Sequence, residues 1–98
     1  MIVSFRNRGT QDIFFGTDSQ AARNTCPPPA WPAARRKLDQ LVLTERLVGL
    51  KEPYGNRLHP LKRDRAGQHA IRINDTYRIC FRWTDAGAED VEITDYHH

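Results

Sequence analysis

The chain has 98 residues, of which 39% are hydrophobic and 28% charged, and its formal net charge is +3. These values predict one small globular domain over residues 1–98, with a single core. No apolar run approaches the ~18 residues of a membrane span, and the N-terminus lacks a secretory apolar region, so we expect a cytoplasmic protein without membrane contact.

The first half of the chain predicts a strand followed by helices. Ile2–Phe5 alternates like a strand, and Gly9–Phe15 is a short helix candidate with Thr10 as a possible N-cap and Gly16 at its end. Residues 18–32 contain Pro27-Pro28-Pro29, which cannot lie inside a helix, so this segment is a stiff connector or the break between two helices.

The strongest helix prediction is Ala33–Leu50. Pro32 suits a first helical turn, and Gly49 can end the helix. Apolar residues recur at a 3.6-residue spacing from Ala34 to Val48. The basic cluster 35–37, which includes Lys37, is either a solvated face or a second phosphate contact.

After Lys51 the apolar period changes from 3.6 to 2, which predicts strands. We expect an extended segment at Asn56–Leu61 and a loop at Arg63–Gly67. Two strands follow, His69–Ile73 and Tyr77–Trp83, joined by a turn at 74–76. A hairpin loop at 85–88 then leads to a last strand, Val91–Thr94. The whole predicts an α+β domain in which an N-terminal strand and two helices pack with a mainly antiparallel sheet, the helices on one face.

Strand parity assigns side chains to the two faces of this sheet. Ile79 and Phe81, with Tyr77 and Trp83, form the core face of their strand. The opposite face receives Cys80 and a row of arginines made of Arg72, Arg78 and Arg82. Such a row is either a phosphate cradle or a set of partners for acidic residues, with Asp90 and Glu92 as candidates.

Charge is divided unevenly along the C-terminal half. Residues 51–83 hold eight Lys or Arg against three acids, whereas residues 84–98 hold five acids and no Lys or Arg. The basic stretch indicates a phosphate-facing surface, or else a solvated face partly neutralised by the acidic tail. Cys26 and Cys80 lack metal-type spacing and are expected to be reduced thiols, with Cys80 filling core space.

The same half contains groups suited to metal-free RNA cleavage: His59, Lys62, Arg78, Asp95, Tyr96 and His97. Each one alone is more often an ordinary loop or surface residue. A metal site built from Asp95 and the histidines is the alternative, but no ligand pair at helical spacing supports it. We therefore expect no metal and no cofactor.

The ordered motifs resemble those of a known family. Residues 56–62 (NRLHPLK), 77–83 (YRICFRW) and 91–97 (VEITDYH) are similar to the HigB branch of the RelE toxin superfamily, and the likeness covers residues 54–97. It implies the toxin of a type II toxin–antitoxin pair, a compact α/β endoribonuclease that cuts messenger RNA, usually in the ribosomal A site. It also implies a HigA-like helix-turn-helix antitoxin that binds operator DNA. The family's functional positions fall on the six residues named above.

Two positions depart from the family pattern. Arg63 follows the lysine where relatives have glycine, and His69 replaces an aromatic residue before the strand. Neither removes a catalytic candidate.

Chemistry assigns provisional roles to the site residues. Arg78 would grip the non-bridging phosphate oxygens and Lys62 would supply a point charge. Asp95 or His97 is the candidate base, His59 the candidate acid or phosphate orienter, and Tyr96 stacks or donates its hydroxyl. Further phosphate contacts are expected from Arg63, Arg65, Arg72, Arg82 and Lys37. The alternatives are a non-catalytic RNA- or ribosome-binding module, and a co-repressor subunit that acts only with its antitoxin.

Overall fold

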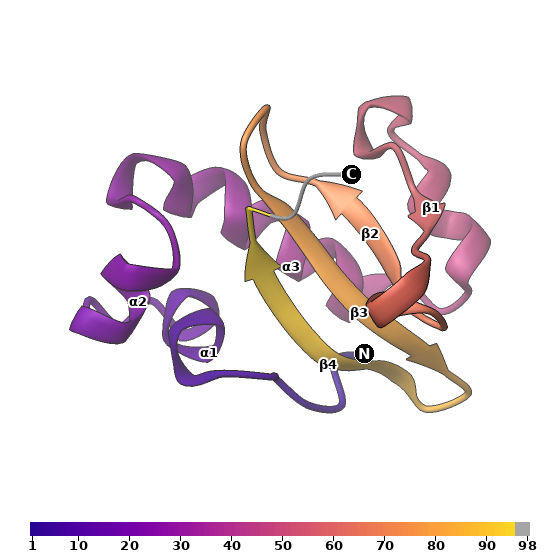
Figure 1. The fold of residues 1–98 in the computed structure, drawn as a ribbon, viewed down its shortest axis with the longest axis horizontal. Coiled ribbons are helices and arrows are strands. Elements are labelled where there is room, and N and C mark those ends of the chain that lie inside the picture. The colour runs from indigo at the N-terminus through magenta and orange to yellow at the C-terminus, as the bar shows by residue number, and fades with distance from the viewer. Residues whose placement is uncertain (96–98) are drawn as a thin grey trace.

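A computed structural model describes residues 1–95 and has the predicted α+β architecture. Its α-helices are α1 (Arg8–Phe15), α2 (Gln20–Thr25) and α3 (Trp31–Leu43), and its strands are β1 (His59–Pro60), β2 (His69–Arg72), β3 (Arg78–Thr84) and β4 (Gly87–Thr94). The strands form one antiparallel sheet in the order β1-β2-β3-β4. Helix α3 crosses one face of this sheet, and α1 and α2 lie beside β4 (Figure 1). Short 3-10 turns are η1 (Pro28–Ala30), η2 (Leu47–Lys51), η3 (Tyr54–Asn56) and η4 (Arg63–Arg65).

The N-terminal segment is extended but does not form the predicted strand. Ile2 and Phe5 make isolated parallel bridges with Ala88 and Val91 of β4. Between those bridges Asp90 adopts a left-handed backbone, with φ 52°, at a bulge where β4 has one residue more than β3. The ladder is interrupted there because a bulge leaves one residue without a regular partner.

Helix α1 begins one residue earlier than predicted and has a different cap. The Asn7 side-chain oxygen accepts a hydrogen bond from the Thr10 amide at 2.9 Å, so Asn7 is the N-cap and the Thr10 prediction was wrong. Gly16 ends the helix in the left-handed region, as predicted. Thr10 is fully buried, and its hydroxyl accepts from the Ile93 amide at 3.0 Å, which joins α1 to the end of β4.

The expected connector at residues 18–32 contains a helix of its own. Helix α2 is capped by the Ser19 hydroxyl, which accepts from the Ala22 amide at 3.0 Å. A Cβ placed on Gly9 of α1 would lie 1.8 Å from the Thr25 hydroxyl of α2, so the two helices meet at a glycine.

Helix α3 is shorter than predicted. Pro32 lies in its first turn, as expected, but the helix ends at Leu43 and not near Gly49. The chain then turns back through η2 towards α3. The Asn56 side chain holds two backbone carbonyls of this segment, those of Leu50 and Glu52, and also bonds to Gln40 of α3.

The core face of the sheet agrees with the parity prediction. Ile79 and Phe81 of β3 are fully buried in one cluster with Leu38 and Leu41 of α3. On the opposite face Cys80 is also fully buried, together with Ala70 and Leu61. This face is therefore partly covered, because the chain after β1 folds across it.

Candidate active site

The Arg78 side chain is fixed at one end of the sheet. Asn74 organises the preceding turn, because its side-chain oxygen accepts from the amides of Thr76 at 2.9 Å and Tyr77 at 2.7 Å. The Arg78 Nη1 group donates to the carbonyls of Asn74 at 2.7 Å and Tyr77 at 3.1 Å. Among residues 1–95, no partner engages Nε or Nη2 of Arg78. The guanidinium is therefore held in place with two of its nitrogens still able to bind an anion.

Positive charge is concentrated around this arginine. Arg78 pairs with Arg72 of β2 on one side and with Thr94 of β4 on the other. Like charges directly opposite each other repel, and Asp75 of the turn offsets part of this by pairing with Arg72. Burial lowers the pKa of Lys37, and the charges of Arg36 and Arg72 lower it further. Bringing a phosphate to this end of the sheet would relieve the repulsion.

The predicted acid partners of the arginine row were wrong. Glu92 pairs with Arg65 at 3.0 Å and lies 3.7 Å from Arg6, rather than pairing with Arg72 or Arg82. Arg65 also donates to Gln68 at 3.2 Å. These contacts hold η4 over the sheet face that carries Glu92.

His59 lies on the edge strand β1 and is half-buried. Its Nδ1 atom is 2.7 Å from the Arg57 carbonyl oxygen. Because a carbonyl oxygen can only accept, Nδ1 carries the proton in this contact. The ring is thus oriented as a general acid or base needs to be.

A buried asparagine fixes the backbone that leads into β1. Asn56 is fully buried, and its amide nitrogen donates to Gln40 Oε1 at 3.0 Å and to the carbonyls of Leu50 at 3.1 Å and Glu52 at 3.2 Å. The Lys37 ammonium donates to the Asn56 side-chain oxygen. Lys37, predicted to contact phosphate, therefore lies on α3 and supports the loop before His59.

The chain after β1 presents exposed cations. Lys62 and Arg63 are exposed, and neither side chain has a hydrogen-bond or ion-pair partner among residues 1–95. Arg63 has φ 57°, a left-handed conformation that favours glycine. A glycine at this position would adopt the same backbone without strain.

Sheet register sets the size of the site. His59 pairs with Ala70, which pairs with Cys80, two residues along β3 from Arg78. Two strand spacings across and two residues along give ~12 Å between the Cα atoms of His59 and Arg78. The register places both side chains on the same face of the sheet. Arg82 is exposed and lies farther along β3, beyond Cys80.

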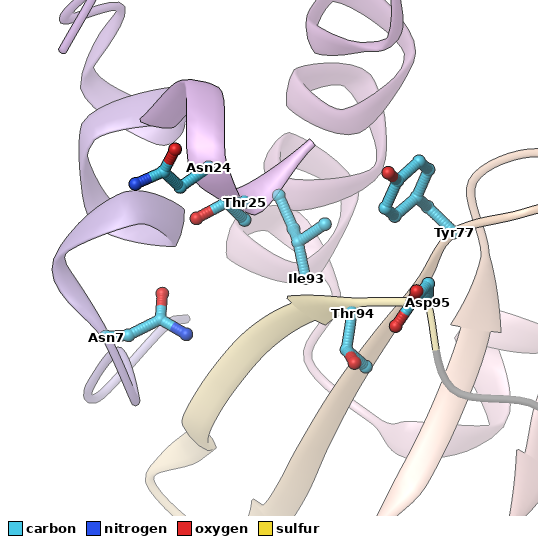
Figure 2. A pocket seen from close by; sticks show the side chains of 7 residues that line it. All are labelled: Asn7, Asn24, Thr25, Tyr77, Ile93, Thr94 and Asp95. Atoms are coloured by element: carbon cyan, nitrogen blue, oxygen red, sulfur yellow. The ribbon is translucent and has the colours of Figure 1, made fainter. Parts of the chain in front are cut away.

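Asp95 follows Thr94 directly and is exposed at the mouth of a polar pocket of about 300 Å³. Figure 2 shows Tyr77 and Asp95 on one side of this pocket and Asn24 and Thr25, from α2, on the other. Asn7, the cap of α1, also lines it. Sequence patterns gave no signal for Asn24 or Thr25, which reach the pocket only because α2 packs beside α1.

His69, a departure from the family pattern, begins β2 with its ring stacked on Phe81 at a centroid distance of 6.4 Å. Its Nδ1 is buried and has no hydrogen-bond partner among the described residues. Burial lowers the pKa of His69, and nearby His59 lowers it further.

Two predicted site residues, Tyr96 and His97, lie outside the described residues. Within residues 1–95, no three His, Cys, Asp or Glu side chains gather as metal ligands do. No helix in that part of the chain is long and apolar enough to cross a membrane.

Comparison with known proteins gives two matches. The family described as the RelE-like toxin of the type II toxin–antitoxin system HigB matches residues 3–97. Toxin HigB-1 of Vibrio cholerae serotype O1 is 27% identical over 88 residues, which is 90% of each chain.

Proposed function

The chain belongs to the RelE-like HigB toxins of type II toxin–antitoxin systems, and we propose that it is an endoribonuclease that cuts messenger RNA in the ribosomal A site. The arrangement at Arg78 carries this proposal. A guanidinium fixed by two turn carbonyls, facing a second arginine and adjacent in the sheet to Thr94-Asp95, suits a phosphate whose charge increases during reaction.

The proposed reaction uses the RNA's own 2′-hydroxyl as nucleophile. A base removes its proton, the oxygen attacks the adjacent phosphorus, and an acid protonates the leaving 5′-oxygen. The products are a 2′,3′-cyclic phosphate and a 5′-hydroxyl, and the step requires no metal. Asp95 or His97 is the candidate base. His59 is the candidate acid or phosphate orienter, because its Nδ1 contact with the Arg57 carbonyl fixes the orientation of the ring.

The remaining residues are assigned to charge and positioning. Arg78 grips the scissile phosphate, Lys62 adds an exposed ammonium, and Tyr96 stacks on a base or donates its hydroxyl. Arg63, Arg72 and Arg82 are proposed to contact flanking phosphates. Arg65 and Lys37, which have protein partners, add positive charge to the approach surface.

Programmed ribosomes provide the test of this function. The full-length protein is added to ribosomes that hold a defined message, and cuts are mapped together with the chemistry of the new ends. Arg78→Ala should reduce the cleavage rate ~100–1000-fold, and Arg78→Lys should restore only part of it because lysine cannot bind in a bidentate way. Arg23→Ala is the matched control, since Arg23 lies on α2 and pairs with Asp18.

Each outcome distinguishes the proposal from its alternatives. Cleavage that leaves 2′,3′-cyclic phosphate and 5′-hydroxyl ends supports the metal-free enzyme. Arrested translation with an intact message indicates a non-catalytic ribosome-binding module. A chain that neither cuts nor slows growth when expressed alone indicates a co-repressor.

The family membership implies an antitoxin partner. We expect it to be a HigA-like helix-turn-helix protein that binds operator DNA and is encoded beside this chain. The proposed substrate places the activity in the cytoplasm, where messages are translated. Co-expression with the neighbouring reading frame should restore growth that the toxin alone inhibits.

A further inference from the structure

A second pocket, of about 390 Å³, lies beside His59 at the edge of the sheet. Its walls are mainly apolar and come from three segments: Leu47 and Val48 of η2, Leu58 and Pro60 around β1, and His69 of β2. The Val48 side chain is 58% exposed, so an aliphatic surface in this wall is accessible to a ligand. A nucleobase would fit a space of this volume.

The pocket contains a flat ring that is suited to stacking. The His69 imidazole lies at 23° to the Phe81 ring, which supports it from the core side. Its Nδ1 is buried and unpartnered within residues 1–95, so protonation there would bury an N–H group without an acceptor. The buried setting therefore favours the uncharged form of the ring, which presents an apolar face.

The charges around the pocket favour an anionic ligand. The titratable side chains that line it are Lys51, His59 and His69, all of them bases, and no acid is among the lining residues. Exposed Lys62 and Arg63 follow β1. A flat, largely apolar slot with a cationic rim matches an aromatic ring that is attached to phosphates.

We propose that this pocket binds a nucleobase of the RNA beside His59, at the edge of the sheet, by stacking it on His69, with Lys51 facing an adjoining phosphate. The proposal rests on the proposed function, since it gives a base-binding subsite to the RNA-cleaving site. The walls offer no carboxylate or amide to read a base edge, so the pocket accepts any base and prefers the larger stacking area of purines.

The test uses a trinucleotide with 2′-O-methyl riboses throughout, which the protein cannot cut, and the same trimer with an abasic nucleotide at each position in turn. Binding to the full-length protein is followed by nuclear magnetic resonance at millimolar ligand. The base-bearing trimer should shift the His69 ring and Val48 methyl signals. One abasic trimer should fail to shift them and should bind about 5- to 100-fold more weakly.

Variants separate stacking from charge. His69→Phe should retain the affinity difference between base and abasic trimers, and His69→Ala should abolish it. Val48→Glu should weaken binding of the base-bearing trimer. Leu43→Glu, at another exposed apolar position outside this pocket, makes the same charge change and should not weaken it. Thermal unfolding of each variant shows whether the fold is intact, and His69→Phe carries the test if His69→Ala unfolds.

Several outcomes would refute the proposal that this pocket binds a nucleobase. If both trimers shift Lys62 and Arg78 equally and leave His69 unmoved, RNA binds but this pocket holds no base. If no signal moves with any trimer, the pocket is also refuted, and the programmed-ribosome assay then decides the proposed function by itself. Stacking on His69 would also be refuted if the affinity difference between the base-bearing and abasic trimers were the same in His69→Ala as in His69→Phe.

Discussion

Replacing Asn56 with alanine should destabilise the protein more than any single exposed substitution. Asn56 is fully buried, and its two amide hydrogens are shared among three oxygens, from Gln40, Leu50 and Glu52. The same side chain accepts from the Lys37 ammonium. One residue thus connects α3 to the two turns that precede β1.

The magnitude follows from these contacts. A hydrogen bond contributes about 0.5–1.5 kcal/mol net, and a buried carbonyl left without a donor costs about 1–3 kcal/mol. Two amide hydrogens and the Leu50 carbonyl, whose bond to Asn56 is buried, therefore give a loss of ~2–6 kcal/mol for Asn56→Ala. Total stability of a small domain is about 5–15 kcal/mol, so this is a large fraction. The melting temperature should fall by roughly 10–25 °C.

Urea unfolding followed by tryptophan fluorescence measures the effect, since Trp31 and Trp83 are both half-buried. Asn24→Ala is the matched control, because Asn24 is exposed and makes one surface bond with Gln20. It should change the free energy of unfolding by less than about 0.5 kcal/mol. If Asn56→Ala is as stable as wild type within this margin, the amide does not hold the loop.

Three further predictions concern the backbone, the thiols and acid stability. Arg63→Gly should raise the free energy of unfolding in urea by up to about 1 kcal/mol, because Arg63 has φ 57°; a destabilised variant would contradict this. Burial raises the pKa of both Cys26 and Cys80 to about 11, so neither thiol should react with a disulfide reagent at pH 8 until urea unfolds the protein. The Ser19 hydroxyl lowers the pKa of Asp12 from its usual 3.8, so the ionised carboxylate stabilises the folded state above pH 4. This contribution to the free energy of unfolding is lost as the pH falls through the lowered pKa that Asp12 has in the folded protein. Asp12→Asn should flatten the pH dependence of unfolding in that acidic range, and an unchanged acid limb would show that Asp12 is not involved.

Local sequence pattern was sufficient to predict the sheet and the faces on which its side chains lie. Alternation of side chains in β3 assigned Ile79 and Phe81 to the core and Arg78 to the other face, because parity depends only on the extended backbone. The turn at residues 74–76 followed from its Asn-Asp-Thr sequence. The ordered motifs around His59, Arg78 and Asp95 indicated the family that the comparison then showed.

Other features depend on contacts between distant residues. Apolar spacing continued past Leu43, yet α3 ends there, because an unbroken helix would place residue 50 ~15 Å beyond Gln40 and out of reach of Asn56. Helix α2 was hidden by the prolines that follow it, although Ser19 is a recognisable cap. The partners of Glu92 could not be read from alternation, because Arg65 reaches it only when η4 folds over the sheet.

The sequence by itself determined the family, the strand faces and the identity of the cations, since these depend on residue type and on a period of two. Only the tertiary structure decided that Nδ1 of His59 contacts the Arg57 carbonyl, that Arg78 is anchored by turn carbonyls, and that His69 lies beside His59 in an apolar pocket. The physical reason is that hydrogen bonding and burial depend on groups brought together from separate segments. Such groups leave no periodic trace in the chain.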